Sequence, residues 1–134
     1  MAGGIKPGQV LADAPHLPSP APIDSYGNGG FRFAGMSHRG SILCLPDGIW
    51  AWPVKDVTEL TLAALEPVFA RGEGLDVFLI GAGREPWSLP ERLRARFREL
   101  PVSVDCLATG PAVRTYNILL AENRRVGAGL IAVE

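Results

Sequence analysis

The sequence has 134 residues, of which 47% are hydrophobic and 20% charged, and its formal net charge is -1. This length and composition predict one domain with a buried core and exclude a disordered chain. The nearly balanced charge argues against a general nucleic-acid-binding protein, which carries a basic excess. The longest apolar run, VFLIGAG, is far shorter than the roughly 20 residues that a membrane-spanning helix needs.

The N-terminal residues 1–21 are rich in Gly, Pro and Ala, and we expect them to form an extended or partly disordered arm. They lack the pattern of a secretory signal and that of a mitochondrial presequence, so we expect a cytoplasmic protein. Residues 22–134 are then predicted to form a single α/β domain.

Short strands and turns predict a β-rich first half of the domain. Residues 26–35 are typical of a glycine-rich turn followed by a short strand, because aromatic residues alternate with an arginine in FRF. Residues 41–45 and 49–54 flank the turn sequence Pro-Asp-Gly and predict a β-hairpin. Thr61 can cap a short helix, although that helix would contain Pro67.

Strands and helices alternate in the second half. Apolar runs at 75–83 and 102–107 predict buried strands, and residues 126–134 predict a final strand. Ser88 is expected to cap the arginine-rich helix that follows it, and a longer helix is expected over about 110–125. This β-α-β-α-β order favours parallel strands joined by right-handed crossovers.

The stretch LATGPAVRTYN, residues 107–117, starts the longer helix directly after a strand. Thr109 is a good N-cap residue, and a helix start presents free N–H groups and the positive end of the helix dipole. Ligands of open α/β sheets bind at the edge where parallel strands end. Such a polar, anion-binding pocket would be formed by Gly83, Asp105, Thr109, Gly110, Arg114 and Asn117. The alternative is ordinary capping plus one hydrogen-bonded core asparagine.

Two other motifs carry weaker signals. Gly81 and Gly83 follow a strand as in a dinucleotide-binding turn, but Pro86 stands where that fingerprint needs a third glycine. His38 and Arg39 could bind an anion, and the histidine could act as an acid or base; the alternative is a solvated loop.

The two cysteines, Cys44 and Cys106, have no metal-ligand spacing and are expected to be buried free thiols. No nucleophile–base pair is visible in the sequence. We therefore expect no metal, no cofactor and no catalytic residue; an enzymatic activity stays open, but the sequence argues against one.

Five stretches together resemble a known family over roughly residues 22–133: YGNGGFRF, SHRGSILCLPDGIWAWPV, DVFLIGAG, LPERLRARFRE and TGPAVRTYNILLAENRRVGAGLIA. It is the small domain family, filed as a domain of unknown function, that includes mitochondrial complex I assembly factor 3, and the chain looks like a bacterial member. The resemblance implies a three-layer α/β fold with a central mixed sheet. The positions that it emphasises are Gly81, Gly83, Thr109, Ala112, Thr115, Tyr116 and Asn117.

Two functional hypotheses follow. The resemblance implies a non-catalytic interaction protein that binds other assembly factors or subunits of a respiratory complex, with a peripheral place at the cytoplasmic face of the inner membrane. The arm, the aromatic residues and the arginine-rich helix would supply its contacts. The alternative is a small-molecule or anion-binding protein, an enzyme included, whose polar pocket lies between the 81–85 turn and the start of the 109–125 helix.

Overall fold

The computed structural model describes residues 11, 12 and 14–134. The predicted arm, residues 1–21, therefore lies partly outside the described residues. Its described part runs along one edge of the domain, where Leu17 forms a β-bridge with Ile49.

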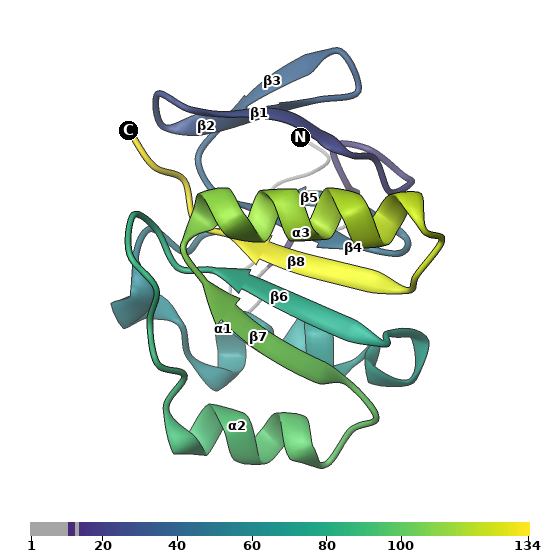
Figure 1. Cartoon of the computed structure of the whole chain (residues 1–134), viewed down its shortest axis with the longest axis vertical. Helices are drawn as coiled ribbons and strands as arrows, with labels where there is room; N and C mark the ends of the chain where they lie inside the picture. Colours follow the sequence, from purple (N-terminus) through teal and green to yellow (C-terminus); the bar gives the residue numbers. More distant parts are fainter. Residues whose placement is uncertain (1–10, 13) are drawn as a thin grey trace.

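A five-stranded mixed sheet forms the centre of the molecule (Figure 1), in the order β5-β4-β8-β6-β7. The strands are β4 (Ile42–Leu45), β5 (Gly48–Ala51), β6 (Val77–Gly81), β7 (Ser103–Leu107) and β8 (Val126–Leu130). Strand β6 runs parallel to both β7 and β8, whereas β4 is antiparallel to β8 and β5. The predicted hairpin and the predicted β-α-β-α-β unit are both confirmed.

Three helices and two 3-10 turns connect these strands. The helices are α1 (Leu62–Phe69), α2 (Glu91–Arg98) and α3 (Thr109–Ala121), and the turns are η1 (Val57–Glu59) and η2 (Gly72–Gly74). Thr61 caps α1 as predicted, since its hydroxyl accepts a hydrogen bond of 3.1 Å from the Ala64 N–H. The predicted Ser88 cap is wrong: α2 starts after Pro90, too far along the chain for Ser88 to reach its first free N–H groups.

A second, three-stranded sheet was missed by the sequence prediction, which gave one strand here. It consists of β1 (Ile23–Gly27), β2 (Gly30–Phe33) and β3 (Met36–Arg39), all antiparallel. Two tight turns make it possible, Asn28-Gly29 and Ala34-Gly35, in which all four residues have positive φ. Such two-residue turns match the twist of a β-hairpin, so the chain doubles back twice within 17 residues.

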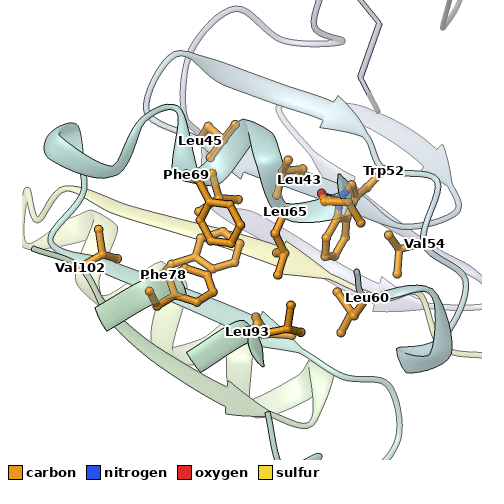
Figure 2. Close-up of a cluster of buried hydrophobic side chains, with 14 of the residues drawn as sticks. Leu43, Leu45, Trp52, Val54, Leu60, Leu65, Phe69, Phe78, Leu93 and Val102 are labelled. Atoms are coloured by element: carbon orange, nitrogen blue, oxygen red, sulfur yellow. Dashed lines mark hydrogen bonds between the residues drawn. The ribbon is translucent and has the colours of Figure 1, made fainter. Parts of the chain in front are cut away.

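The elements form three layers, as the resemblance implied. Helices α1 and α2 cover one face of the central sheet, and α3 with the three-stranded sheet covers the other. Figure 2 shows the first interface, where Phe69 of α1 and Phe78 of β6 meet among leucines. Phe97 of α2 joins them, with its ring 5.0 Å from that of Phe69 and 6.0 Å from that of Phe78. Fully burying a side chain of this size contributes about 1.5–3 kcal/mol to folding.

Most of the aromatic residues that were expected at a partner surface belong to these interfaces. Phe31, Phe33, Trp50 and Trp52 are buried, and only Trp87 is partly exposed.

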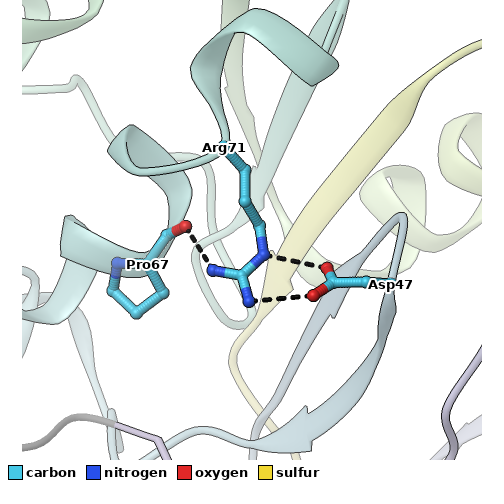
Figure 3. A network of polar contacts seen from close by, with 3 residues as sticks. All are labelled: Asp47, Pro67 and Arg71. Carbon is cyan, nitrogen blue, oxygen red and sulfur yellow. Dashed lines mark hydrogen bonds and ion pairs between the residues drawn. The ribbon is translucent and has the colours of Figure 1, made fainter.

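The β5 edge of the central sheet is held by a salt bridge as well as by the arm. Arg71 donates from Nε and one terminal nitrogen to the carboxylate of Asp47 in the β4–β5 turn, at 2.8 and 3.0 Å. The other terminal nitrogen donates to the carbonyl of Pro67 in α1 (Figure 3). One arginine thereby ties the turn to the helix that covers it.

Candidate functional site

The predicted polar edge exists as a place in the fold. Strands β6 and β7 are parallel, so their carboxyl ends lie together, and α3 starts there. Gly81 lies against the helix, because a Cβ atom at this position would come within 3.1 Å of the Thr109 Cα. Gly83 has a φ of 108°, a conformation that favours glycine and turns the chain sharply out of β6.

Thr109 has a different role from the predicted one. The N-cap of α3 is Ala108, which has no side-chain cap, and Thr109 is the first helical residue and fully buried. Its hydroxyl accepts from the Gly83 N–H at 3.0 Å and donates to the Ile131 carbonyl at 2.7 Å. Its N–H also donates to the Gly83 carbonyl at 2.8 Å. Thr109 therefore joins the ends of β6 and β8 to the helix, and its polar atoms are occupied by the protein itself.

Gly110 is covered by a residue that the sequence analysis did not single out. A Cβ atom at Gly110 would collide with the hydroxyl of Tyr26 in β1. The Tyr26 phenol thus lies over the start of α3, while 42% of the residue stays exposed to solvent. The signal that could have found it is the Asn28-Gly29 turn, which pairs β1, the strand of Tyr26, with β2.

Asn117 meets its predicted need for a hydrogen-bond partner within the protein. Its Oδ1 accepts from the Ile23 N–H at 2.8 Å, and its Nδ2 donates to the Ile23 carbonyl at 2.9 Å. The preceding residue, the buried Tyr116, donates its hydroxyl to the Ala21 carbonyl at 3.2 Å. Together the two side chains hold the start of β1 on α3. Asn117 thus has the structural role of a hydrogen-bonded asparagine, which the sequence analysis gave as the alternative to a binding pocket.

The other predicted residues of α3 differ in exposure. Arg114 is exposed and Thr115 partly buried. Asp105 is exposed on β7 and lines a hollow of about 360 Å³ that also contains Ser88, Arg94 and Cys106.

His38 and Arg39 lie in the three-stranded sheet, on β3, and line a different hollow of about 390 Å³. Tyr26, Arg32 and Ser37 line it too, and none of these was predicted. Arg32 donates to the Ser37 hydroxyl at 2.7 Å. Burial and the neighbouring His16, whose ring lies 4.8 Å away, lower the pKa of His38.

Neither cysteine has the environment of an activated nucleophile. Cys44 is completely buried, and this burial raises the pKa of its thiol to about 12. Burial also raises the pKa of Cys106. Within residues 11, 12 and 14–134, no three His, Cys, Asp or Glu side chains are grouped so that they could hold a metal ion. None of the helices in this same part of the chain has the length and apolar character that a bilayer crossing requires.

A family model described as "Protein of unknown function (DUF498/DUF598)" matches residues 23–131, which include every element from β1 to β8. The chain belongs to this family. The resemblance to the family filed as a domain of unknown function is thereby confirmed.

Relatives of this chain occur in bacteria and in a fly. An uncharacterized protein of Rhodobacter capsulatus is 39% identical over 82% of this chain and 83% of its own length. NADH dehydrogenase [ubiquinone] 1 alpha subcomplex assembly factor 3 of Drosophila melanogaster is 30% identical over 81% of this chain, but the match spans only 57% of the fly protein. A crystal structure described as an outer membrane protein from Bartonella henselae is 50% identical, with a TM-score of 0.85 over 89% of this chain and all of the other.

The polar edge and both hollows lie inside the part of the chain that the family model matches, since all their lining residues fall within 23–131. The comparisons assign no role to any of these residues. The chain is a distant relative of a complex I assembly factor, and its predicted ligand-binding residues stay a prediction.

Proposed function

We propose that this chain acts by binding other proteins, as an assembly-factor-like protein of a respiratory complex. The observation that carries the proposal is the similarity to the fly assembly factor, which extends over 81% of this chain and so involves the whole fold rather than one motif. Its partners would be other assembly factors or subunits of the complex, and it would bind them at the cytoplasmic face of the inner membrane.

The internal contacts of the polar edge support a binding role over a catalytic one. The Thr109 hydroxyl is occupied by Gly83 and Ile131, and the Asn117 amide by Ile23. Polar side chains whose hydrogen bonds are already made within the protein are poorly placed to receive a reacting substrate. A surface role is also consistent with the charges of α2, where three of the four arginines, Arg92, Arg94 and Arg98, are exposed.

Affinity purification from the native host, followed by mass spectrometry, tests this proposal. We expect the tagged protein to enrich subunits or assembly proteins of complex I over a tagged unrelated domain of similar size. A variant lacking residues 1–21 would report whether the arm contributes. If cells that make complex I yield no such enrichment, the assembly role is wrong.

A second candidate function is the binding of a small anion in the three-stranded sheet. The hollow of about 390 Å³ brings together Arg32, His38 and Arg39, and none of its lining residues is acidic. The Glu134 carboxylate and the Arg39 guanidinium both lie beside Gly29. Titration with inorganic phosphate should then change the amide NMR chemical shifts of residues 36–39. Arg39→Ala should abolish these changes. Shifts that spread evenly over the surface would dismiss this site.

A further inference from the structure

Strand β7 is an edge strand whose outer side has no backbone partner in the described part of the chain. The backbone N–H and C=O groups of its odd-numbered residues point toward β6. The Ser103 N–H donates to the Asp76 carbonyl, and the Leu107 carbonyl accepts from the Ala82 N–H. In a parallel ladder the alternate residues point the other way. The N–H and C=O groups of Val104 and Cys106 therefore face outward, which leaves a short row of donors and acceptors for another strand.

A groove runs along this outer side, between β7 and α2, and residues 86–89, which precede α2, line its first part. It consists of two hollows of about 360 and 260 Å³ that share Arg94 and Val104. The floor is apolar, because the Val104 and Cys106 side chains pack against the core under α2. Figure 1 shows α2 beside β7 at the end of the sheet opposite to β5.

The charge along the groove is mainly positive on the α2 side. Arg94 lines both hollows, and the only hydrogen bond of its side chain to a described residue runs from Nε to the Leu89 carbonyl at 3.2 Å. Arg98 lines the second hollow and pairs with the exposed Glu91. Asp105, the acidic residue of the strand, also lines the first hollow, whereas the second hollow has no acidic lining residue.

We propose that β7 is a docking edge for an extended, acidic segment of a partner protein, which adds to the central sheet as a sixth strand. The added backbone would bond to Val104 and Cys106, and carboxylates at alternate positions would meet Arg94 and Arg98. Strand addition of this kind draws its affinity from main-chain hydrogen bonds and its specificity from alternate side chains. The inference rests on the proposed binding function and names the surface and partner chemistry for it.

Charge favours this occupant over a second copy of the chain. Antiparallel pairing of β7 with another β7, about an axis normal to the sheet, would place both α2 helices on the same face. The arginines of the two helices would then face one another, and such like-charge contacts oppose association. An acidic strand makes the opposite, attractive contact.

The probe is a fluorescein-labelled peptide of nine alternating threonine and glutamate residues, which presents all its carboxylates on one face of a strand. The control peptide has lysine in place of glutamate. We expect the acidic peptide alone to bind the full chain, more weakly at higher salt, and to slow amide exchange at Val104 and Cys106. Arg94→Glu should weaken binding by at least about tenfold. Arg92→Glu, an equal charge change on the same helix at a residue outside the groove, should leave it within about twofold.

The two cysteines supply an independent readout. Cys44 is fully buried, whereas Cys106 lines the groove and is partly exposed. Bound peptide should therefore slow the alkylation of Cys106 by iodoacetamide in the wild type and not in Arg94→Glu. A Val104→Pro variant removes one outward N–H at an edge position, where proline can be accommodated, and should also weaken peptide binding. Thermal melts of all variants identify any that fail to fold.

Three results would overturn the docking edge: no binding of the acidic peptide, equal losses in Arg94→Glu and Arg92→Glu, or protection of amides away from β7. A concentration-dependent dimer that Val104→Pro abolishes would mean that a second copy occupies the edge. Purification of Arg94→Glu from the host separates the two proposals. Complex I proteins that still co-purify with this variant would preserve the assembly role and refute the docking edge. Loss of enrichment already in the wild type would refute the assembly role itself.

Discussion

The two edges of the central sheet are finished in different ways. At the β5 edge the chain covers itself: the N–H groups of His16 and Leu17 donate to the Ile49 carbonyl, and the Ile49 N–H donates to Leu17. At the β7 edge the described residues offer no such partner, and arginines line the groove instead. Exposed edges invite pairing with other chains, so native proteins cover them or mark them with charge. This domain uses the first solution on one side and the second on the other.

Amide hydrogen exchange gives the largest expected contrast between these edges. The Ile49 N–H is bonded to Leu17 at 2.9 Å, whereas the Val104 and Cys106 N–H groups have no described backbone partner. Bonded core amides exchange only by opening, and unbonded edge amides exchange nearly freely. We expect Ile49 to exchange at least about a hundredfold more slowly than Val104, after correction for intrinsic rates, by NMR in deuterated buffer.

Leu107 provides the internal control, because β7 residues of odd number are bonded to β6 and should be protected. Equal protection of Val104 and Leu107 in dilute monomer would mean that the outer side of β7 is covered, and the contrast between the edges would be lost.

A single added methyl group can disrupt the contact between the arm and β5. A Cβ atom at Gly48 would lie 2.7 Å from the Leu17 carbonyl oxygen and 3.0 Å from the Pro15 Cβ. Gly48→Ala should therefore push the arm off the strand, lower the free energy of unfolding by about 1–3 kcal/mol, and expose the Ile49 amide. Chemical denaturation and the exchange rate of Ile49 measure the two effects.

Gly74→Ala is the matched control, since a Cβ atom there would meet nothing within 4 Å. It should be neutral or stabilise the domain by up to about 1 kcal/mol. If Gly48→Ala were as stable as Gly74→Ala and kept Ile49 protected, the arm would not be the cover of the β5 edge.

The central sheet and its helices were predictable because their signals are local. The apolar run that became β6 and the Pro-Asp-Gly turn that joins β4 to β5 each specify their structure within ten residues. The three-stranded sheet was missed because β3 is only four residues long and half exposed, so its alternation is faint. The Asn28-Gly29 turn was the usable signal, since this dipeptide with positive φ at both positions is typical of a hairpin.

The candidate site was less predictable because its residues have partners far away in sequence. Thr109 has the chemistry of an N-cap, and only the fold shows that its hydroxyl bonds to Ile131, 22 residues further on. Asn117 was correctly expected to need a partner, but Ile23 lies 94 residues away. The sequence thus identified polar side chains that are important, but it could not show that their hydrogen bonds are made to backbone groups elsewhere in the chain.

The smallest expected effect concerns the ion pairs beside the two edges. Hydrogen bonds from Arg71 hold the pKa of Asp47 below its ordinary value of 3.8. A carboxylate with a lowered folded pKa contributes stability above its unfolded pKa, and loses that contribution as the pH falls through the folded value.

Asp47→Asn should therefore lower the free energy of unfolding by about 1 kcal/mol or less at pH 7, because 56% of the Asp47 side chain is exposed. The difference from wild type should shrink below about pH 4. Glu91→Gln, which breaks the exposed pair with Arg98 beside β7, should leave the urea midpoint unchanged across this range. Equal losses in both variants would show that the Asp47–Arg71 pair adds nothing specific to the closed edge, and that only the arm distinguishes β5 from β7.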